Sequence, residues 1–540
     1  MSASGSWRSI CLSIDAGRRD LIAIYLLTLL ARIAIAAFQA QPGYMDAYYY
    51  TVGAQRLAEG YGFTEPYVWN YLDDPSSLPH PSHLYWMPLP SIVGALSMAL
   101  FGATFRAAQI PFALLSATLP LIAYTIAWRA TARRRAAWIA ALLMVFSGYY
   151  LPFWCVPESF ATYAVAGSLA LLLAGAGRSK TAALAAGVCA GLAHLSRADG
   201  LLLLIPVMLT AEVRMQNGEV RRKNERRPFP HSSFPILHSS IFVLLGYFVV
   251  MLPWFLRNLS VIGTPLSTAG AQSLWLCNYD ELFSFGVTLD VGHWLGCGID
   301  RILAAKARGL GMGVVHLAAE NGLIFLAPLM AVGLWRQRRE RLFRPAILYL
   351  VLLFLAMTLA FTFVGDRGGL FHSTSALMPF LCAAAPIGLD EIVGFVARRR
   401  RTWHAETANR VFGMGMVALA ALLSLVVVWN RVARQGWNGA DIAYHQAGAW
   451  LARQGDVDSI VMAGNPPSFT FHTGHPSIVT PNGDVDTLLA AARRLGAKWL
   501  ILYANHPGPL AALYDDTSLD ARLKLTQSFG KASLFEIVGP

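Results

Sequence analysis

The residues best placed to do chemistry are acids that adjoin long apolar segments. Asp46 lies shortly after the apolar residues 21–38, in the sequence MDAYYY. Glu158 lies in the sequence PESF, just before another apolar segment. An ionisable group at the edge of a membrane costs free energy unless it is paired or used, so both acids are candidate functional residues. An ionised carboxylate accepts protons, and this makes Asp46 a candidate general base.

Both acids also have a purely structural interpretation. Asp46 could cap the start of a helix, because acids are common at that position. Glu158 could stabilise a helix start through the helix dipole. A functional role is favoured because both acids are expected on the same side of the membrane, and because Asp46 lies among aromatic residues.

Three arginines are candidates for binding an anionic group, since guanidinium groups pair well with phosphate and carboxylate. They are Arg197 in LSRADG, Arg257 in WFLRN and Arg367 in VGDRGG. Arg197 could equally form a local salt bridge with Asp199.

Further candidates adjoin these segments. Asp366 and His372 lie in a polar, glycine-rich run between two spans, residues 364–380, whose glycines let a ligand approach the backbone closely. No GK[ST] sequence follows, so this stretch is not a P-loop. His83 completes the set and lies in the aromatic, proline-rich sequence HPSHLYWMPLP.

The composition of the chain defines its class. Of 540 residues, 55% are hydrophobic and only 14% are charged, and the mean hydropathy is +0.47. These values indicate a polytopic membrane protein. The net charge of +12 does not indicate a nucleic-acid partner, because the arginines form short runs between apolar segments.

Apolar length predicts about eleven spans. The apolar residues 88–101 are only 14 residues long, so an interfacial helix within an external loop, residues 41–104, is expected there. The expected spans are residues 21–38, 105–128, 136–153, 160–174, 181–196, 201–213, 237–256, 310–335, 345–364, 376–396 and 411–429.

The distribution of positive charge orients these spans. Segments expected on the inner side, among them residues 214–227, 336–344 and 398–410, carry 25 of the 43 Lys and Arg residues. Because positive residues concentrate on the cytoplasmic side, the N-terminal segment, residues 1–20, is expected in the cytoplasm. The expected location is the inner (plasma) membrane, with every candidate residue on its outer side.

Residues 430–540 have a different character. Short apolar runs such as SIVMAG and KWLILY alternate with amphipathic stretches, which is typical of a small α/β domain. The predicted architecture is therefore an all-α membrane domain over residues 21–429, with external interfacial helices, followed by an external α/β domain. Cys277 and Cys297 share one expected external loop and could either pair or remain free.

This arrangement resembles the GT-C class of bacterial membrane glycosyltransferases. The resemblance rests on MDAYYY, on PESF, on the external helix after an aromatic-proline stretch, and on the external C-terminal domain. It is closest to the group that contains the aminoarabinose lipid A transferases and the protein O-mannosyltransferases. One difference is that Trp86 and Met87 precede Pro88, where the aminoarabinose transferases have an acidic-basic pair.

The resemblance implies an inverting glycosyltransferase with a polyprenyl-phosphate-type sugar donor and a lipid, protein or polysaccharide acceptor. Asp46 would be the catalytic base, and Glu158 would support catalysis or ligand binding. Arg197, Arg257 and Arg367 are the candidates for binding the donor phosphate. No cofactor is required, although Asp46 and Glu158 could hold a divalent metal.

Two other classes of protein remain open. A transporter or flippase of lipid-linked sugars would also be polytopic, although such proteins commonly have inverted repeats and polar groups near the bilayer midplane. A membrane scaffold whose C-terminal domain binds a partner would make no use of Asp46. Transfer of labelled sugar by the purified protein would separate the enzyme from both.

The orientation can be tested directly. We expect a phosphatase reporter fused after residue 540 to be active, because the C-terminal domain should lie outside the cytoplasm. A reporter fused within residues 398–410 should be inactive and serves as the control. An inactive C-terminal fusion that is fully expressed would contradict the predicted topology.

Overall fold

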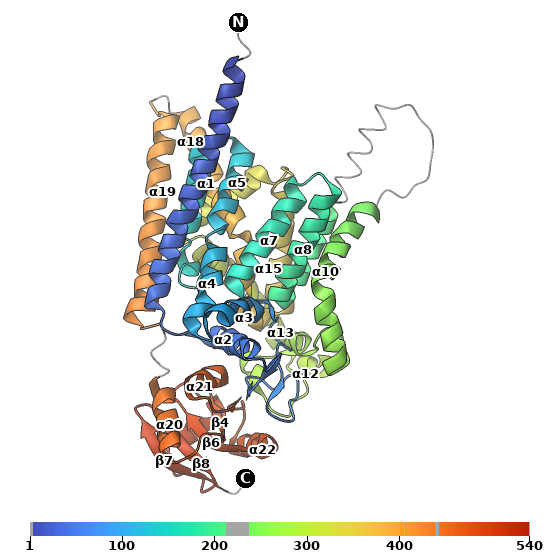
Figure 1. Cartoon of the computed structure of the whole chain (residues 1–540), viewed down its shortest axis with the longest axis vertical. Helices are drawn as coiled ribbons and strands as arrows, with labels where there is room; N and C mark the ends of the chain where they lie inside the picture. Colours follow the sequence, from blue (N-terminus) through green and yellow to red (C-terminus); the bar gives the residue numbers. More distant parts are fainter. Residues whose placement is uncertain (1–3, 212–236, 401, 438–441, 539–540) are drawn as a thin grey trace.

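The computed structural model describes residues 4–211, 237–400, 402–437 and 442–538. Its helices form a tall bundle, and a small α/β region lies at one end of it (Figure 1). Helix α1 (Ser4–Phe38) runs along the side of the bundle, and its N-terminal end lies far from the C-terminal region. The expected inner segment 214–227 lies outside the described residues.

Seven segments of the described chain are long and apolar enough to cross a membrane. The membrane character of the chain is therefore confirmed, whereas the expected count of eleven spans is not. These segments are Gly17–Phe38, Phe105–Thr131, Ser159–Ala176, Ser239–Ile262, Ile299–Asn321, Thr362–Arg399 and Ala405–Arg434. Shorter apolar helices cover Leu89–Phe101, Ala198–Ala211 and Arg344–Ala360.

Two expected spans are broken in the structure. The expected span 310–335 is divided between α13 (Ile299–His316) and α14 (Ala327–Gln337), with Leu323 and Ile324 at positive φ between them. The expected span 136–153 contains α6 (Arg134–Val145) and the short 3-10 helix η1 (Gly148–Tyr150), and the chain turns between them. Gly148 has a φ of 60°, and a Cβ there would lie 2.5 Å from Leu323. Apolar length alone does not reveal such turns.

The core of the bundle is built from helices rich in small residues. Helices α5 (Leu119–Thr131), α6, α7 (Ser159–Ala176) and α18 (Met378–Arg399) share one apolar cluster. A Cβ on Gly333 of α14 would lie 2.0 Å from the Ala384 carbonyl oxygen of α18. Small residues therefore let these helices approach closely, as is common in membrane bundles.

The remaining bundle helices surround this core. They are α4 (Phe105–Ser116), α8 (Lys180–Ser196), α10 (Leu237–Ile262), α15 (Arg344–Leu355), α16 (Thr362–Val364), α17 (Leu370–Thr374) and α19 (Ala405–Val428).

The first loop forms a compact layer between the bundle and the C-terminal region (Figure 1). It contains α2 (Met45–Ala58), β1 (Thr64–Glu65), β2 (Tyr67–Val68), β3 (His80–Pro81) and α3 (Leu89–Phe101). The short helix α3 stands where an interfacial helix was expected, and it packs against α2.

A second loop, residues 263–298, lies beside this layer and contains α11 (Ala269–Gln272) and α12 (Val291–Gly296). In this loop Cys277 and Cys297 form a disulfide, so the paired alternative holds.

The C-terminal region has a six-stranded mixed sheet with strand order β2-β5-β4-β6-β8-β7, which confirms the predicted α/β character. Its own strands are β4 (Ile460–Ala463), β5 (Ser477–Val479), β6 (Ala497–Leu502), β7 (Leu523–Phe529) and β8 (Ala532–Ile537). Its helices are α20 (Ile442–Arg453), α21 (Pro466–Thr473), α22 (Val485–Leu495) and α23 (Ala511–Asp515).

One strand of this sheet comes from the first loop. Strand β2 runs parallel to β5, with Tyr67 opposite Ser477 and Val68 opposite Ile478. Val68 and Ile478 are fully buried in the core of the C-terminal region. The first loop and the C-terminal region therefore form one structural unit, although about 400 residues separate them in the sequence.

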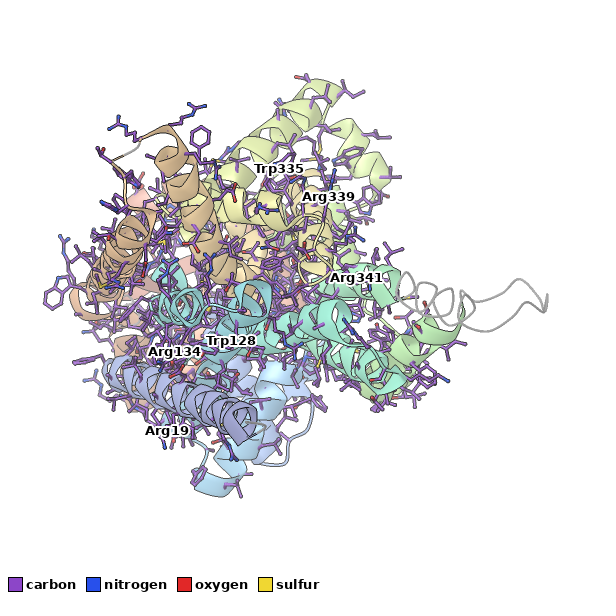
Figure 2. All side chains as sticks on the ribbon, turned by 90° about the horizontal axis from the view of Figure 1, so that it is seen from above. Arg19, Trp128, Arg134, Trp335, Arg339 and Arg341 are labelled. Carbon is purple, nitrogen blue, oxygen red and sulfur yellow. A yellow bond between two sulfur atoms is a disulfide. The ribbon has the colours of Figure 1, made fainter. Side chains whose placement is uncertain are left out.

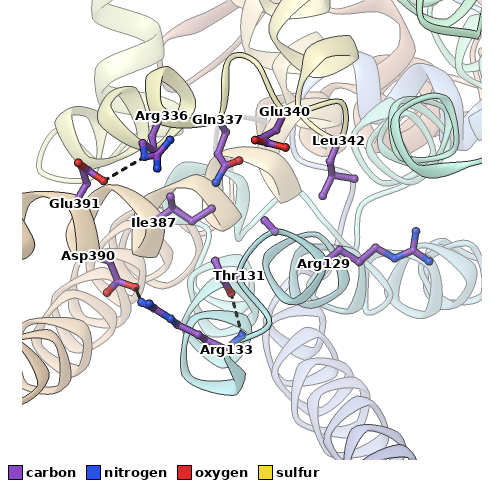
Figure 3. Close-up of a pocket in the computed structure, with 11 residues that line it drawn as sticks. Arg129, Thr131, Arg133, Arg336, Gln337, Glu340, Leu342, Ile387, Asp390 and Glu391 are labelled. Atoms are coloured by element: carbon purple, nitrogen blue, oxygen red, sulfur yellow. Dashed lines mark hydrogen bonds and ion pairs between the residues drawn. The ribbon is translucent and has the colours of Figure 1, made fainter. Parts of the chain in front are cut away.

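The opposite end of the bundle carries arginines and exposed tryptophans, including Arg19, Arg339, Arg341, Trp128 and Trp335 (Figure 2). A cavity of about 550 Å³ opens there between α5, α14 and α18 (Figure 3). Ion pairs around it include Arg133 with Asp390 (3.0 Å) and Arg336 with Glu391 (3.4 Å).

Candidate functional site

Asp46 lies in the first turn of α2, where the chain leaves the first span and turns into the loop layer. The helix begins after Tyr44, which has extended backbone angles, and no side chain caps it. Asp46 is therefore not the helix cap. The residues that follow, Ala47 to Ala54, are buried and fix α2 in place.

Glu158 precedes α7 and is almost fully buried. Its Oε2 accepts a hydrogen bond from the Phe160 backbone N–H (3.2 Å), and its Oε1 accepts one from the Ser159 hydroxyl (2.5 Å). Glu158 thus caps the helix, as its structural interpretation expects. The same carboxylate also faces His372, so capping does not account for all of its contacts.

His372 joins the two acids. Its Nε2 lies 3.7 Å from Asp46 Oδ2 and 3.4 Å from Glu158 Oε1. The Nδ1 atom lies 2.7 Å from the Gly368 carbonyl oxygen, which can only accept a hydrogen bond, so Nδ1 carries a proton. The imidazole stacks on Phe160, with ring centroids 4.2 Å apart. In a neutral imidazole the Nε2 lone pair would therefore face two carboxylates, which is unfavourable unless a proton or a cation lies between them.

The environment also changes the affinity of the acids for protons. Burial raises the pKa of Asp46 to about 6, and the negative charge of Glu158 adds to this, while His372 and Arg197 oppose it. Burial likewise raises the pKa of Glu158. At neutral pH Asp46 is thus largely ionised, and its pKa lies close to the range that suits a general base.

These three residues could also hold a metal ion. Ligand atoms of Asp46, Glu158 and His372 lie within 4.8 Å of one another. Two carboxylates and one imidazole form a donor set that suits a divalent cation. Cys277, His293 and Cys297 are the other group close enough within the described residues, but a disulfide joins its two cysteines.

Arg197 lies behind the acids. Its Nε donates to Asp199 Oδ1 (3.1 Å) and to the Ser373 hydroxyl (3.2 Å), and its Nη1 donates to the Ser159 hydroxyl (3.4 Å). The local salt bridge with Asp199 is therefore present. Through Ser159 the same arginine also supports the Glu158 carboxylate.

A cavity of about 880 Å³ opens beside Asp46 and His372. Aromatic side chains form much of its wall, and Arg367, Arg431 and Glu320 contribute charge. The lining residues are Gly43, Tyr44, Asp46, Tyr149, Phe153, Phe160, Glu320, Arg367, Phe371, His372, Arg431, Gln435 and Trp437.

The structure brings together only part of the residue set expected from the sequence. Asp46, His372 and Arg367 line the cavity, and Glu158 adjoins it. Arg257 does not reach it, because its guanidinium lies over Trp254 (4.7 Å) and donates to the Phe63 carbonyl oxygen (3.1 Å).

His83 and Asp366 do not line the cavity either. His83 is buried, and its ring contacts Ser82 (2.7 Å) and Ser91 (2.9 Å). Asp366 contacts His316 Nε2 at 3.2 Å.

Two lining residues were not anticipated, and each had a signal in the sequence. Glu320 is an acid inside an expected span, which by itself marks a functional candidate. Arg431 follows the last expected span on the outer side, where the positive-inside rule disfavours cations. Both signals depend on the unusual position of a charge, and neither residue belongs to a motif.

The C-terminal region holds the residues on either side of Asp46. The Trp437 indole Nε1 donates to the Pro42 carbonyl oxygen (2.9 Å), and a Cβ on Gly43 would lie 2.3 Å from the Trp437 ring. Gly43 has a φ of 92°, so glycine is needed there both for its backbone and for the contact. On the helix itself, the Tyr48 hydroxyl lies 3.0 Å from His472 Nε2 of α21.

Comparisons with known proteins find one matching family model and several similar folds. Residues 80–254 match the family model described as dolichyl-phosphate-mannose-protein mannosyltransferase. Comparison with curated proteins by sequence finds no match.

Solved structures are similar over most or all of the chain. The structure of ArnT from Cupriavidus metallidurans bound to undecaprenyl phosphate has 14% identity and a TM-score of 0.55, with each chain fully covered. Its apo state gives 13% identity and a TM-score of 0.52, again with both chains fully covered. The oligosaccharyltransferase AglB from Archaeoglobus fulgidus, in complex with an inhibitory peptide and a dolichol-phosphate, has 13% identity and a TM-score of 0.51. That similarity covers 89% of this chain and 69% of AglB. The expected resemblance is thus confirmed in the matched family model and in the architecture: the chain has the fold of the GT-C membrane glycosyltransferases.

Proposed function

We propose that the chain is a glycosyltransferase that moves a sugar from a polyprenyl-phosphate-type donor to an acceptor hydroxyl on the outer side of the inner membrane. The observation that carries this proposal is the cavity beside Asp46, which combines a raised carboxylate pKa, an aromatic wall and two arginines. The undecaprenyl phosphate bound by the similar ArnT structure supports a donor of this class.

The chemistry needs one proton acceptor and one stabilised leaving group. Asp46 takes the proton from the acceptor hydroxyl while the hydroxyl oxygen attacks the anomeric carbon. The bond from that carbon to the donor phosphate breaks, and the polyprenyl phosphate leaves with the electron pair. Arg367 and Arg431 stabilise the charge that develops on the phosphate. A single in-line displacement of this kind inverts the anomeric centre.

Glu158 and His372 support Asp46. His372 is oriented by its hydrogen bond to Gly368, so its Nε2 faces both acids. The reaction as written needs no metal. If a divalent cation binds, Asp46, Glu158 and His372 would hold it, and it would neutralise charge on the donor phosphate.

The orientation of the chain is part of the proposal. A disulfide between Cys277 and Cys297 fits an oxidising compartment such as the periplasm. It lies in the loop beside the first loop, whereas the end of the bundle that is rich in arginine lies opposite (Figure 2). The cavity, the disulfide and the C-terminal region would then face outward.

Replacing Asp46 by Asn tests the role of the base. Asn keeps the shape and polarity of the side chain but cannot accept the proton, so sugar transfer should fall about a hundred- to ten-thousand-fold. The measurement is transfer of labelled sugar from a polyprenyl-phosphate donor by purified protein. Asp515→Asn, an exposed acid of α23, is the matched control and should keep parental turnover. Near-parental turnover in correctly inserted Asp46→Asn protein would remove Asp46 as the base.

The raised pKa of Asp46 predicts a pH dependence. The base must be ionised, so the rate should rise with pH through about 6 and fall to about a tenth of its plateau at pH 5. Protonation of Asp46 over that pH range does not destabilise the folded protein. Its folded pKa lies above its usual value of 3.8, so protonation favours the folded state as the pH falls. A rate that falls only near pH 4 would contradict the raised pKa.

The proposed contacts of Arg367 and Arg431 with the donor phosphate predict the effect of removing either arginine. A charge-assisted hydrogen bond contributes about 1.5–3 kcal/mol, so Arg367→Ala or Arg431→Ala should weaken donor binding about ten- to a hundred-fold. The Kd for polyprenyl phosphate is the measurement. Arg434→Ala is the matched control, because Arg434 lies in the same turn as Arg431 but does not line the cavity. Unchanged affinity in both test variants would exclude these arginines from the phosphate site.

A further inference from the structure

Three charged residues of the cavity wall share an unusual backbone setting. Glu320 lies in the short π-helical segment η5 (Leu317–Asn321) and Arg431 in η9 (Trp429–Arg434), and Arg367 lies at a kink within a third, η7 (Gly365–Gly369). Segments of this type interrupt the regular hydrogen bonding of a helix and are frequent at functional sites. Each of them delivers one charge to the same cavity, so the three residues are best explained together.

Glu320 differs from the other two in sign. Arg367 and Arg431 suit the donor phosphate, whereas a carboxylate would repel it. Within the described residues no ion pair joins Glu320 to either arginine, and its ion pair is with His316. That pair leaves one of the two carboxylate oxygens of Glu320 to be accounted for.

One oxygen of Glu320 is held, and the other is free. Oε1 lies 3.0 Å from His316 Nδ1, and His316 Nε2 in turn lies 3.2 Å from Asp366 Oδ1. The imidazole is thus fixed between two carboxylates and orients Glu320. Oε2 is buried and has no hydrogen-bond partner among the described residues. A buried carboxylate oxygen is costly to leave unpaired, so its position in a cavity wall indicates a ligand group.

We infer that Glu320 is a specificity-determining residue that binds the transferred sugar through a hydroxyl or amino group. The inference rests on the proposed function. The sugar is bonded directly to the phosphate, so a donor held by Arg367 and Arg431 places its sugar in the cavity that Glu320 lines. Sites built to hydrogen-bond a substrate group discriminate strongly against analogues that lack it. His316 is a positioning residue for Glu320.

The test compares donors with and without the sugar. The probes are polyprenyl phosphate alone, the same lipid carrying a neutral hexose, and the same lipid carrying an amino sugar. Glu320→Gln and Glu320→Ala should weaken binding of a sugar-bearing donor at least tenfold and leave the Kd for polyprenyl phosphate unchanged. Arg431→Ala should weaken all three. Glu340→Gln, an exposed glutamate at the other end of the bundle, is the matched control.

Three variants at position 320, with Gln, Ala or Asp, also identify the sugar group that Glu320 binds. If Glu320 binds an amino group, Glu320→Gln should lose selectivity for the amino sugar, because its charge partner is gone. If it binds hydroxyl groups, Glu320→Gln should retain more affinity for the hexose than Glu320→Ala does. Glu320→Asp keeps the charge and should keep the parental order of donor preference at lower affinity, and it provides a second variant should Glu320→Gln fold poorly.

Two results would overturn the inference. The first is parental affinity for every sugar-bearing donor in Glu320→Gln and Glu320→Ala. The second is an equal loss for polyprenyl phosphate alone, which would show that Glu320 only supports the structure. If the parental protein transfers sugar and either of these results is obtained, this inference is refuted and the proposed function stands. Parental protein that neither binds nor uses a sugar-bearing donor would refute the proposed function, and the inference with it.

Discussion

Two carboxylates and one imidazole share a buried space at one end of the helix bundle, and the surrounding architecture depends on keeping them there. Like charges in a medium of low dielectric constant repel strongly, so Asp46 and Glu158 can lie near each other only if a proton or a cation lies between them. His372 provides the shared contact, and Gly368 fixes its orientation. The three side chains come from α2, the start of α7 and α17, so these elements must meet at one point.

The C-terminal α/β region helps to hold α2, and with it Asp46, in place. Its sheet takes β2 from the first loop, and its helix α21 places His472 against Tyr48, two residues after Asp46. Trp437, just before the α/β region, packs on Gly43 and bonds to Pro42. Helix α2 is therefore fixed from the side facing away from the bundle. A helix with a buried charge in its first turn needs such support, because removing that charge from water costs free energy that other contacts must offset.

The sequence predicted the class of fold and the position of the acids, and failed where local backbone geometry decides. Composition and charge runs identified a membrane protein with an α/β region, because these signals are averaged over many residues. Asp46 and Glu158 were predicted because acids beside apolar runs are rare. Arg257 was placed with them on topology alone, yet it packs on Trp254, a contact that no periodicity predicts. Glu320 was missed because residues 310–335 were predicted as one continuous span, and Arg431 was missed because it follows the last expected span and was assigned to the C-terminal region.

Within the described residues, the two arginines that line the cavity beside Asp46 have no carboxylate partner, and this supports the assignment of the cavity. At the arginine-rich end, Arg133 and Arg336 each pair with a carboxylate (Figure 3), and Arg134 pairs with Asp20. Beside Asp46, Arg367 and Arg431 form no ion pair within the described residues, and each lies instead near an aromatic ring, Tyr279 at 5.1 Å and Phe153 at 6.0 Å. An arginine held by an aromatic face keeps its hydrogen-bond donors available. Paired arginines stabilise a structure, whereas unpaired ones in a cavity wall leave positive charge for a ligand. A phosphate that enters and leaves with each turnover needs a site whose arginines are not paired, since a permanent carboxylate partner would compete with it.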